Sequence, residues 1–302
     1  MPGGAAGVGP ATGGPAGLSA PVGSCLVTSA TPPRPARPTA LVTGATAGLG
    51  AGFARSLARR GHDLVIVARD AERLDSTAAA LRAEHGVGVE VLAADLSVRA
   101  DLDRVAQRVG SVEAPVDVLV NNAGFGLKQR FFDGDPADHE RMFDVLCRAV
   151  MVLSRAAAGA MVPRGRGRVL NVGSVAGLVP GGGHYSAAKA YVIVLTETLA
   201  GELRGTGVTA TVVEPGYVRT EFHARSGMRS GGSSSLSNRI WLDIDEVVDA
   251  ALDDTFAGRV VSVPTRRWKA VSTLLDVAPR RLVSTVWNAM PSGARRRHPT
   301  QR

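Results

Sequence analysis

The stretch ALVTGATAGLG, residues 40–50, contains the transition that decides the fold. Ala40–Thr43 is a short apolar, β-branched run, and a helical pattern begins near Gly50. Between them, Gly44, Gly48 and Gly50 let the backbone turn tightly from a strand into a helix. The N-terminus of such a helix offers free N–H groups and a positive dipole end, and both attract phosphate. The TGxxxGxG spacing predicts a nucleotide-binding turn; a glycine turn needed only for packing is the alternative.

Strands and helices continue to alternate after this turn. Short apolar runs predict strands at 40–43, 63–68, 87–93, 116–121, 168–172, 208–214 and 260–263. Amphipathic stretches predict helices at 50–60, 71–85, 99–109 and 138–161. Such alternation forms right-handed crossovers, and strands that are apolar throughout are covered on both faces. We therefore expect an α/β fold of Rossmann type, a doubly wound parallel sheet in three αβα layers, with a C-terminal helical extension.

Composition bounds the organisation of the 302 residues, of which 45% are hydrophobic. Residues 1–38 are rich in Gly, Pro and Ala without periodicity, which predicts a disordered tail. Residues 39–265 are expected to form the dinucleotide-binding catalytic domain, and 266–302 a basic amphipathic C-terminal extension. Two cysteines exclude a disulfide framework and a cysteine-rich zinc site. No run of 18 apolar residues and no secretory signal is present, so we expect a cytoplasmic protein without a transmembrane helix.

The formal net charge of +8 lies in the two tails. Two arginines precede residue 39 and six follow Asp276, and these segments contain no further acid. The segment between them is near neutral, so the charge does not indicate nucleic-acid binding.

The extension combines apolar residues at helical spacing with flanking basic residues. Trp268, Val271, Leu274, Leu275 and Val277 fall at roughly helical spacing, which predicts a helix with an apolar face. This face could pack on the domain, cover the substrate cleft or join a dimer. Alternatively, it could make a peripheral contact with an anionic membrane, which would favour a lipid-like substrate.

The end of the second predicted strand indicates which coenzyme binds. An NAD site places an acid at this point, where it binds the ribose 2′-hydroxyl. Here Ala68 occupies the position and Arg69 follows, and an arginine pairs well with a 2′-phosphate. We therefore expect NADP(H) rather than NAD(H), although Asp70 is close and a solvated surface arginine is the alternative.

Tyr185 and Lys189 are four residues apart in a helical pattern, so they share a face. A neighbouring ammonium favours the phenolate and makes the phenol a usable proton donor near neutral pH. Ser174 ends a predicted strand 11 residues earlier and could hold a carbonyl oxygen beside Tyr185. Tyr191 has no lysine four residues on and is expected to pack in the helix.

These motifs resemble the single-domain branch of the short-chain dehydrogenase/reductase family. They occur in the family's order over about 180 residues: TGATAGLG (43–50), Asp95–Leu96, Asn121–Gly124, Ser174, Tyr185 with Lys189, and Pro215–Thr220. The resemblance implies NADPH-dependent reduction of a ketone or aldehyde, or the reverse oxidation of the alcohol. A homo-oligomer formed through the long helices is also implied.

The resemblance also implies roles for individual residues. Tyr185 would be the general acid/base, Lys189 would lower its pKa and bind the nicotinamide ribose, and Ser174 would orient the substrate carbonyl. Val218 and Thr220 would touch the carboxamide. Together with Arg69, the implied coenzyme-binding set is Gly44, Thr46, Gly48, Leu49, Gly50, Asp95, Leu96, Asn122, Ala123, Gly124, Tyr185, Lys189, Pro215, Gly216, Val218 and Thr220.

Two features depart from the family pattern. Leu146 stands where the family has an asparagine that helps hold a water beside the lysine, and leucine has neither donor nor acceptor. The neighbouring Cys147 is expected to point about 100° away around the helix. The spacing from Ser174 to Tyr185 is also a residue or two short. We expect an enzyme with a slower proton relay; a catalytically weak dinucleotide-binding sensor or scaffold is the alternative.

A Gly/Ser-rich loop, Arg225–Asn238, follows the sixth predicted strand. It is expected to be either a flexible lid or an idle surface loop. Asp243 with Glu246 then resembles a capping box that opens the next helix.

Overall fold

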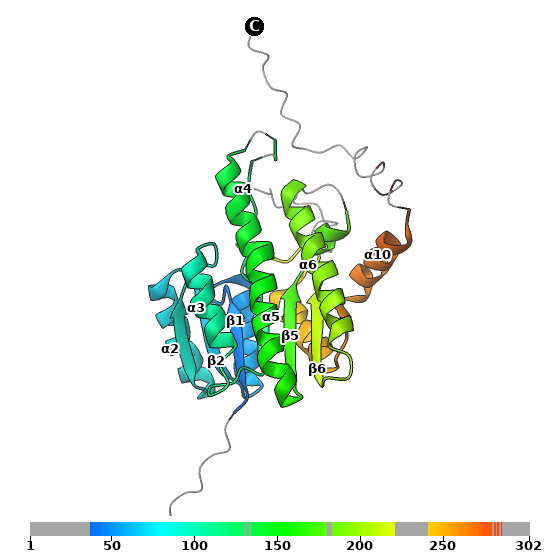
Figure 1. Ribbon diagram of the computed structural model, residues 1–302. Helices are drawn as coiled ribbons and strands as arrows, with labels where there is room; N and C mark the ends of the chain where they lie inside the picture. Colours follow the sequence, from blue (N-terminus) through cyan, green and yellow to red (C-terminus); the bar gives the residue numbers. More distant parts are fainter. Residues whose placement is uncertain are drawn as a thin grey trace, which may run out of the picture. The chain divides into compact units, whose positions relative to one another are not determined.

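The computed structural model describes residues 37–129, 131–132, 134–179, 183–220, 241–279, 281, 283 and 285. Its centre is a seven-stranded parallel sheet in the order β3-β2-β1-β4-β5-β6-β7 (Figure 1). The strands are β1 Thr39–Thr43, β2 Asp63–Ala68, β3 Val89–Ala93, β4 Val118–Asn121, β5 Gly167–Val172, β6 Val208–Val213 and β7 Val261–Ser262. All seven lie within or one residue beyond the predicted runs, so the predicted fold class is confirmed.

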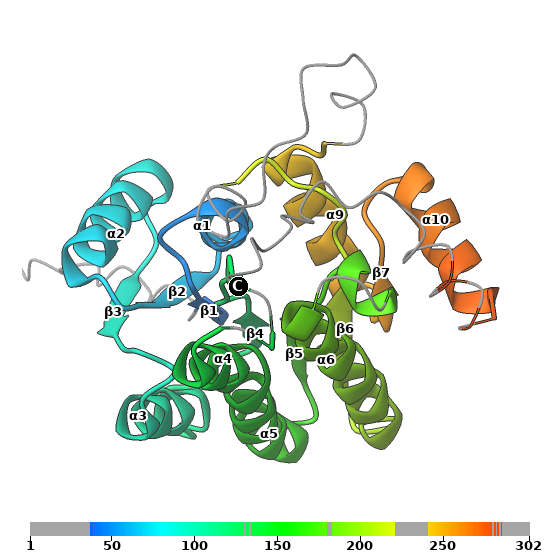
Figure 2. The same ribbon diagram turned by 90° about the horizontal axis from the view of Figure 1, so that it is seen from above.

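Two helix layers cover the sheet, as Figure 2 shows. On one face lie α1 Gly48–Arg59, α2 Ala71–His85 and α9 Ile244–Phe256, and on the other α3 Arg99–Val109, α4 Pro136–Phe143, α5 Ala149–Met161 and α6 Gly183–Glu202. Successive strand residues point to opposite faces. Ala40 and Val42 therefore pack beneath α1 and α9, while Leu41 packs beneath α3 and α5. This alternation of two apolar cores explains why the strands are apolar throughout.

The predicted helix 138–161 begins two residues earlier and contains a π-helical turn, η1, at Asp144–Arg148. A 3-10 turn, η2 Val162–Arg164, extends this helical stretch to 29 residues. By length and composition alone it could cross a membrane, which the sequence analysis did not anticipate. However, 56% of its apolar window is buried within the domain, as in the core helix of a soluble protein.

The C-terminal side of the domain ends in α10, Arg266–Val277. Thr265, just before it, has φ +79° and ψ 142° and is the one non-glycine residue with a positive φ in the described part of the chain. At the start of α9, Asp243 caps the helix as predicted, but its carboxylate accepts from the Asp245 N–H at 2.9 Å. The predicted tail, except for residues 37 and 38, and the loop 225–238 lie outside the described residues.

Candidate active site

The glycine turn has the geometry that a phosphate group needs. Gly44 and Gly48 have φ angles of +68° and +53°, a backbone conformation that is strained for residues with a side chain. A Cβ on Gly50 would lie 2.1 Å from the Gly44 carbonyl oxygen, so the turn admits no side chain there. Ala47 caps α1 without a side-chain hydrogen bond, and no acid lies in the first turn. The first N–H groups of α1 can therefore receive an anion, and the turn fits the diphosphate of a dinucleotide.

A hydrogen-bonded joint connects this turn to the end of β4. The Thr43 hydroxyl accepts from the N–H groups of Asn122 and Ala123, each at 3.0 Å. The Asn122 side chain donates to the carbonyls of Thr43 at 2.9 Å and Gly44 at 3.3 Å. These residues therefore fix the spacing of β1 and β4 beneath the turn.

At the ends of β2 and β3, the structure brings Arg69 and Asp95 together. The Arg69 guanidinium is largely exposed, and its Nη1 lies 4.0 Å from Asp95 Oδ2. The other oxygen of Asp95 accepts from the Ser97 N–H and hydroxyl. Burial opposes ionisation of Asp95, but the Ser97 hydrogen bonds and the charge of Arg69 outweigh it and lower the pKa of Asp95. The next residue, Leu96, is buried in the core.

Sequence reasoning missed a second arginine, Arg73, in the first turn of α2. Its guanidinium donates to the Thr46 carbonyl at 3.3 Å, within the glycine turn. Asp70 accepts from the Arg73 N–H as the helix cap. The position of Arg73, four residues after Arg69 at the start of a helix, is a weak sequence signal that could have indicated its contact with Thr46.

Ser174, Tyr185 and Lys189 are brought together as the sequence predicted. Ser174 follows β5 and caps the short helix η3, Val175–Leu178, where its oxygen accepts from the Ala176 N–H at 3.1 Å. Its hydroxyl is hydrogen-bonded to the Tyr185 hydroxyl despite the short spacing. Lys189 Nζ lies 5.8 Å from the centroid of the Tyr185 ring. The three groups meet at the carboxyl end of the sheet, the same end as the glycine turn.

The net shift of the Tyr185 pKa is upward, opposite to the net lowering expected from Lys189. Burial raises the pKa of Tyr185 to about 12, and the Ser174 hydrogen bond only partly offsets it. Burial also lowers the pKa of Lys189 to about 8. The ammonium donates to the Val172 carbonyl at 2.6 Å and lies over the Tyr185 ring.

Leu146 and Cys147 share one apolar cluster, contrary to the expectation that Cys147 points away. Both side chains are buried beside Tyr185, and both lie in the π turn η1. Leu146 packs against Gly124, where an added Cβ would lie 2.6 Å from Leu146 Cδ2. Burial raises the pKa of the Cys147 thiol to about 11, and its sulfur lies 3.7 Å from the Ala188 carbonyl oxygen.

A pair of histidines beside Tyr185 was also missed, and no pattern in the sequence marked it. His139 Nδ1 and His184 Nδ1 are 3.3 Å apart, and the largely exposed Phe131 packs edge-on against both rings. Burial and the neighbouring His139 lower the pKa of His184.

The segment 215–220 returns to the glycine turn. A Cβ on Gly48 would lie 3.3 Å from Thr220, so the two segments are in contact. Val218 pairs with Leu242, and its side chain is buried in an apolar cluster. Any contact of Val218 with the carboxamide is therefore left to its main chain.

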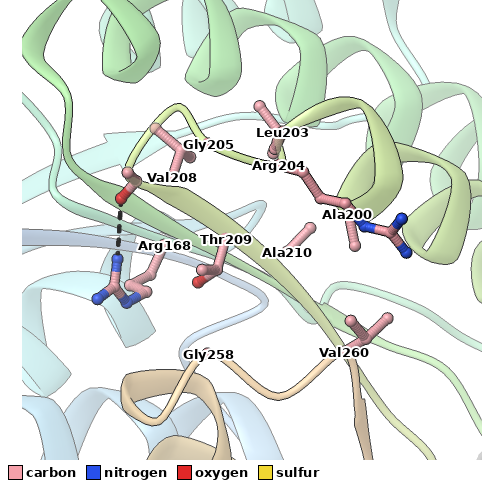
Figure 3. Close-up of a pocket in the computed structure, with 11 residues that line it drawn as sticks. Arg168, Ala200, Leu203, Arg204, Gly205, Val208, Thr209, Ala210, Gly258 and Val260 are labelled. Carbon is pink, nitrogen blue, oxygen red and sulfur yellow. Dashed lines mark hydrogen bonds between the residues drawn. The ribbon is translucent and has the colours of Figure 1, made fainter.

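A cavity lies away from these residues. It has a volume of about 430 Å³. Figure 3 shows residues that line it, among them Arg168, Thr209 and Val260. It lies where β5 and β6 begin, at the opposite end of the sheet from Tyr185, and the Arg168 guanidinium donates there to the Gly207 carbonyl at 3.4 Å. It contains no predicted site residue, so we assign it no role.

A family model of short chain dehydrogenases matches residues 38–229. The chain belongs to the short-chain dehydrogenase/reductase family. Members of this family are NAD(P)-dependent oxidoreductases acting on a CH–OH group or the corresponding carbonyl, so this dehydrogenase is an enzyme of that class.

Several relatives of this dehydrogenase have named activities. The NADP-dependent 3-hydroxy acid dehydrogenase YdfG of Salmonella typhi is 38% identical over 205 residues, covering 67% of this chain and 80% of the relative. The ketoacyl reductase HetN of Nostoc sp. is 37% identical over 182 residues, covering 60% and 63%. Among solved structures, the short-chain dehydrogenase from Sphingobium yanoikuyae in complex with NADPH is 38% identical, with TM-score 0.71, covering 80% of this chain and 97% of that one.

Proposed function

We propose that this dehydrogenase interconverts a ketone or aldehyde and its alcohol with NADP(H), and that Tyr185 supplies the proton during reduction. The observation that carries the proposal is that Ser174, Tyr185 and Lys189 lie together at the carboxyl end of the sheet, the same end as the glycine turn. A protein that only binds a dinucleotide has no chemical need for these three groups.

The coenzyme supplies the hydride when bound. The Tyr185 hydroxyl gives its proton to the substrate oxygen in the direction of reduction. Ser174 is hydrogen-bonded to Tyr185 and so can hold the same oxygen in place. Lys189 places a positive charge beside the ring, which stabilises the phenolate left after the transfer.

Coenzyme preference rests on Arg69. Its exposed guanidinium at the end of β2 suits a 2′-phosphate, whereas Asp95 already accepts from Ser97 and lies beside the arginine. The YdfG relatives are NADP-dependent, and the Sphingobium structure contains NADPH. We infer that NADP(H) is the coenzyme and that Gly44, Gly48 and the N-terminus of α1 hold its diphosphate.

The substrate class is narrower in the relatives than in this proposal. They include a 3-hydroxy acid dehydrogenase, a ketoacyl reductase and an alcohol dehydrogenase specific for bulky ketones. A carbonyl panel for this chain should therefore contain 3-oxo acids, 3-oxoacyl esters and bulky ketones.

Leu146 favours a second candidate, the catalytically weak sensor. Its apolar side chain is buried beside Tyr185 where the family has an asparagine. In such a protein the coenzyme would bind without measurable turnover.

The test joins binding to turnover. NADPH and NADH are titrated by fluorescence, and oxidation is followed at 340 nm with the panel for wild type and Tyr185→Phe. We expect tighter binding of NADPH and turnover that is lost in Tyr185→Phe but retained in the matched control Tyr191→Phe. Tight binding without turnover across the panel would favour the sensor, and no binding of either nucleotide would overturn the coenzyme assignment.

A further inference from the structure

The C-terminal helix α10 touches the segment that approaches the glycine turn. Trp268, in its first turn, lies so close to Gly216 that a Cβ on the glycine would be 2.1 Å from Trp268 Cε2. The neighbouring Tyr217 ring lies 6.0 Å from the Trp268 ring and 5.7 Å from the Trp241 ring, between centroids. Glycine is therefore required at 216 because the indole occupies the space of a side chain.

A second contact lies one turn further along α10. The Ser272 hydroxyl donates to Glu214 Oε2 at 3.1 Å, and both residues are almost fully buried. Glu214 directly precedes Pro215, so α10 contacts the 215–220 segment at its beginning by two side chains.

The same helix also packs on η3, the turn that Ser174 caps. There the Val175 N–H donates to the Pro215 carbonyl at 3.3 Å. The segment bearing Ser174 and the segment that ends against Gly48 are therefore joined to each other and to α10. By contrast, Leu274 and Val277 on α10 are 65% and 73% exposed, so they do not take part in this contact.

We propose that α10 is a positioning element of the coenzyme site: Trp268, seated on Gly216, and Ser272, bonded to Glu214, hold residues 215–220 in place for the nicotinamide half of NADP(H). This inference rests on the proposed function. A segment that is already held loses less conformational freedom when the ligand binds, and this raises affinity. Trp268 and Ser272 act through the segment and are positioning residues. The effect should be confined to ligands that reach this segment.

The experiment compares two ligands by calorimetry. NADPH carries the nicotinamide, whereas 2′,5′-ADP carries only the adenosine end with the 2′-phosphate. In Trp268→Ala the Kd for NADPH should rise about tenfold or more, because the cost of ordering one segment on binding changes affinity by about this factor. The Kd for 2′,5′-ADP should stay within about twofold of the wild-type value. Leu274→Ala, on the exposed side of α10, should leave both values unchanged.

A double-mutant cycle keeps the proposal testable from the other side of the contact. Gly216→Ala should weaken NADPH binding in the wild-type background, because the new Cβ meets Trp268. In the Trp268→Ala background the same substitution should reduce NADPH affinity little further. The role of α10 would be overturned if Trp268→Ala weakened the binding of both ligands equally or of neither. It would also be overturned if the effects of Trp268→Ala and Gly216→Ala on NADPH affinity were fully additive. A wild-type chain that binds neither ligand would overturn the proposed function with it, and circular dichroism identifies a variant that has merely unfolded.

Discussion

At the scale of single residues, burial dominates the proton chemistry of the site. The pKa of Tyr185 is raised and the pKa of Lys189 is lowered, because desolvation favours the neutral form of each side chain. The phenol is thereby kept protonated, which suits a proton donor for carbonyl reduction. The lysine is the group that titrates within the working range.

This predicts a pH limit for reduction. Lys189 has a pKa of about 8, lowered by burial, so its positive charge is present below about pH 8 and lost above it. Tyr185, with a pKa of about 12, stays protonated throughout. We expect kcat/KM for carbonyl reduction to fall above about pH 8, by up to about tenfold per pH unit.

Cys147→Ala is the control for this profile. The Cys147 thiol has a pKa of about 11 and is neutral across this range, so the limb should persist without it. A profile that stays flat to pH 10, or a limb that disappears in Cys147→Ala, would contradict the assignment to Lys189.

A second residue-scale prediction concerns coenzyme choice. Arg69→Ala should weaken NADPH about 10- to 100-fold and leave NADH nearly unchanged, because a charge-assisted contact is worth about 1.5–3 kcal/mol. Arg73→Ala is the matched comparison, since Arg73 bonds the Thr46 carbonyl and should affect both coenzymes alike. Fluorescence titration measures the Kd of each variant for NADPH and for NADH. An equal loss of affinity for the two coenzymes in Arg69→Ala would contradict a role of Arg69 in selecting NADPH.

At the scale of elements, local sequence was sufficient where the structure is decided locally. The strand of residues 39–43, its glycine turn and the i, i+4 pair of Tyr185 and Lys189 were predictable because backbone geometry and helical spacing determine them. The π turn was not, because no residue pattern over Asp144–Arg148 distinguishes it from the α-helices on either side. The contact of Trp268 with Gly216 depends on where α10 docks, and sequence periodicity carries no such information.

The entry to α10 stores backbone strain that can be relieved. Thr265 has φ +79° and ψ 142°, a region close to one that glycine alone adopts readily and that costs other residues about 1–3 kcal/mol. Thr265→Gly should therefore raise the free energy of unfolding by about 0.5–2 kcal/mol, after the larger entropy of glycine in the unfolded chain is subtracted. Urea denaturation measures it. Thr265→Ala keeps a Cβ and should show no such gain; equal stabilisation by both variants would refute the strain.

At the scale of the whole molecule, exposed apolar residues on the long helices agree with the homo-oligomer expected from the family. Val194 on α6 is 61% exposed and Met151 on α5 is 43% exposed. We predict that light scattering will give a mass that is a multiple of 31.2 kDa and that Val194→Lys will lower it. A wild-type monomer at tens of micromolar, or an unchanged assembly in Val194→Lys, would contradict this surface. Exposed Glu197→Lys serves as the charge control.

The joint between Thr43 and Asn122 has a consequence for how the chain is made. Its partners are 79 residues apart, and β1 pairs with both β2 and β4. At about 5–20 residues per second, a ribosome needs several seconds to deliver Asn122 after Thr43 has been added. During that interval one edge of β1 has no strand to pair with, and the phosphate-binding turn has no support. The nucleotide site therefore cannot form until β4 has been made, and until then the nascent chain exposes an unpaired edge of β1.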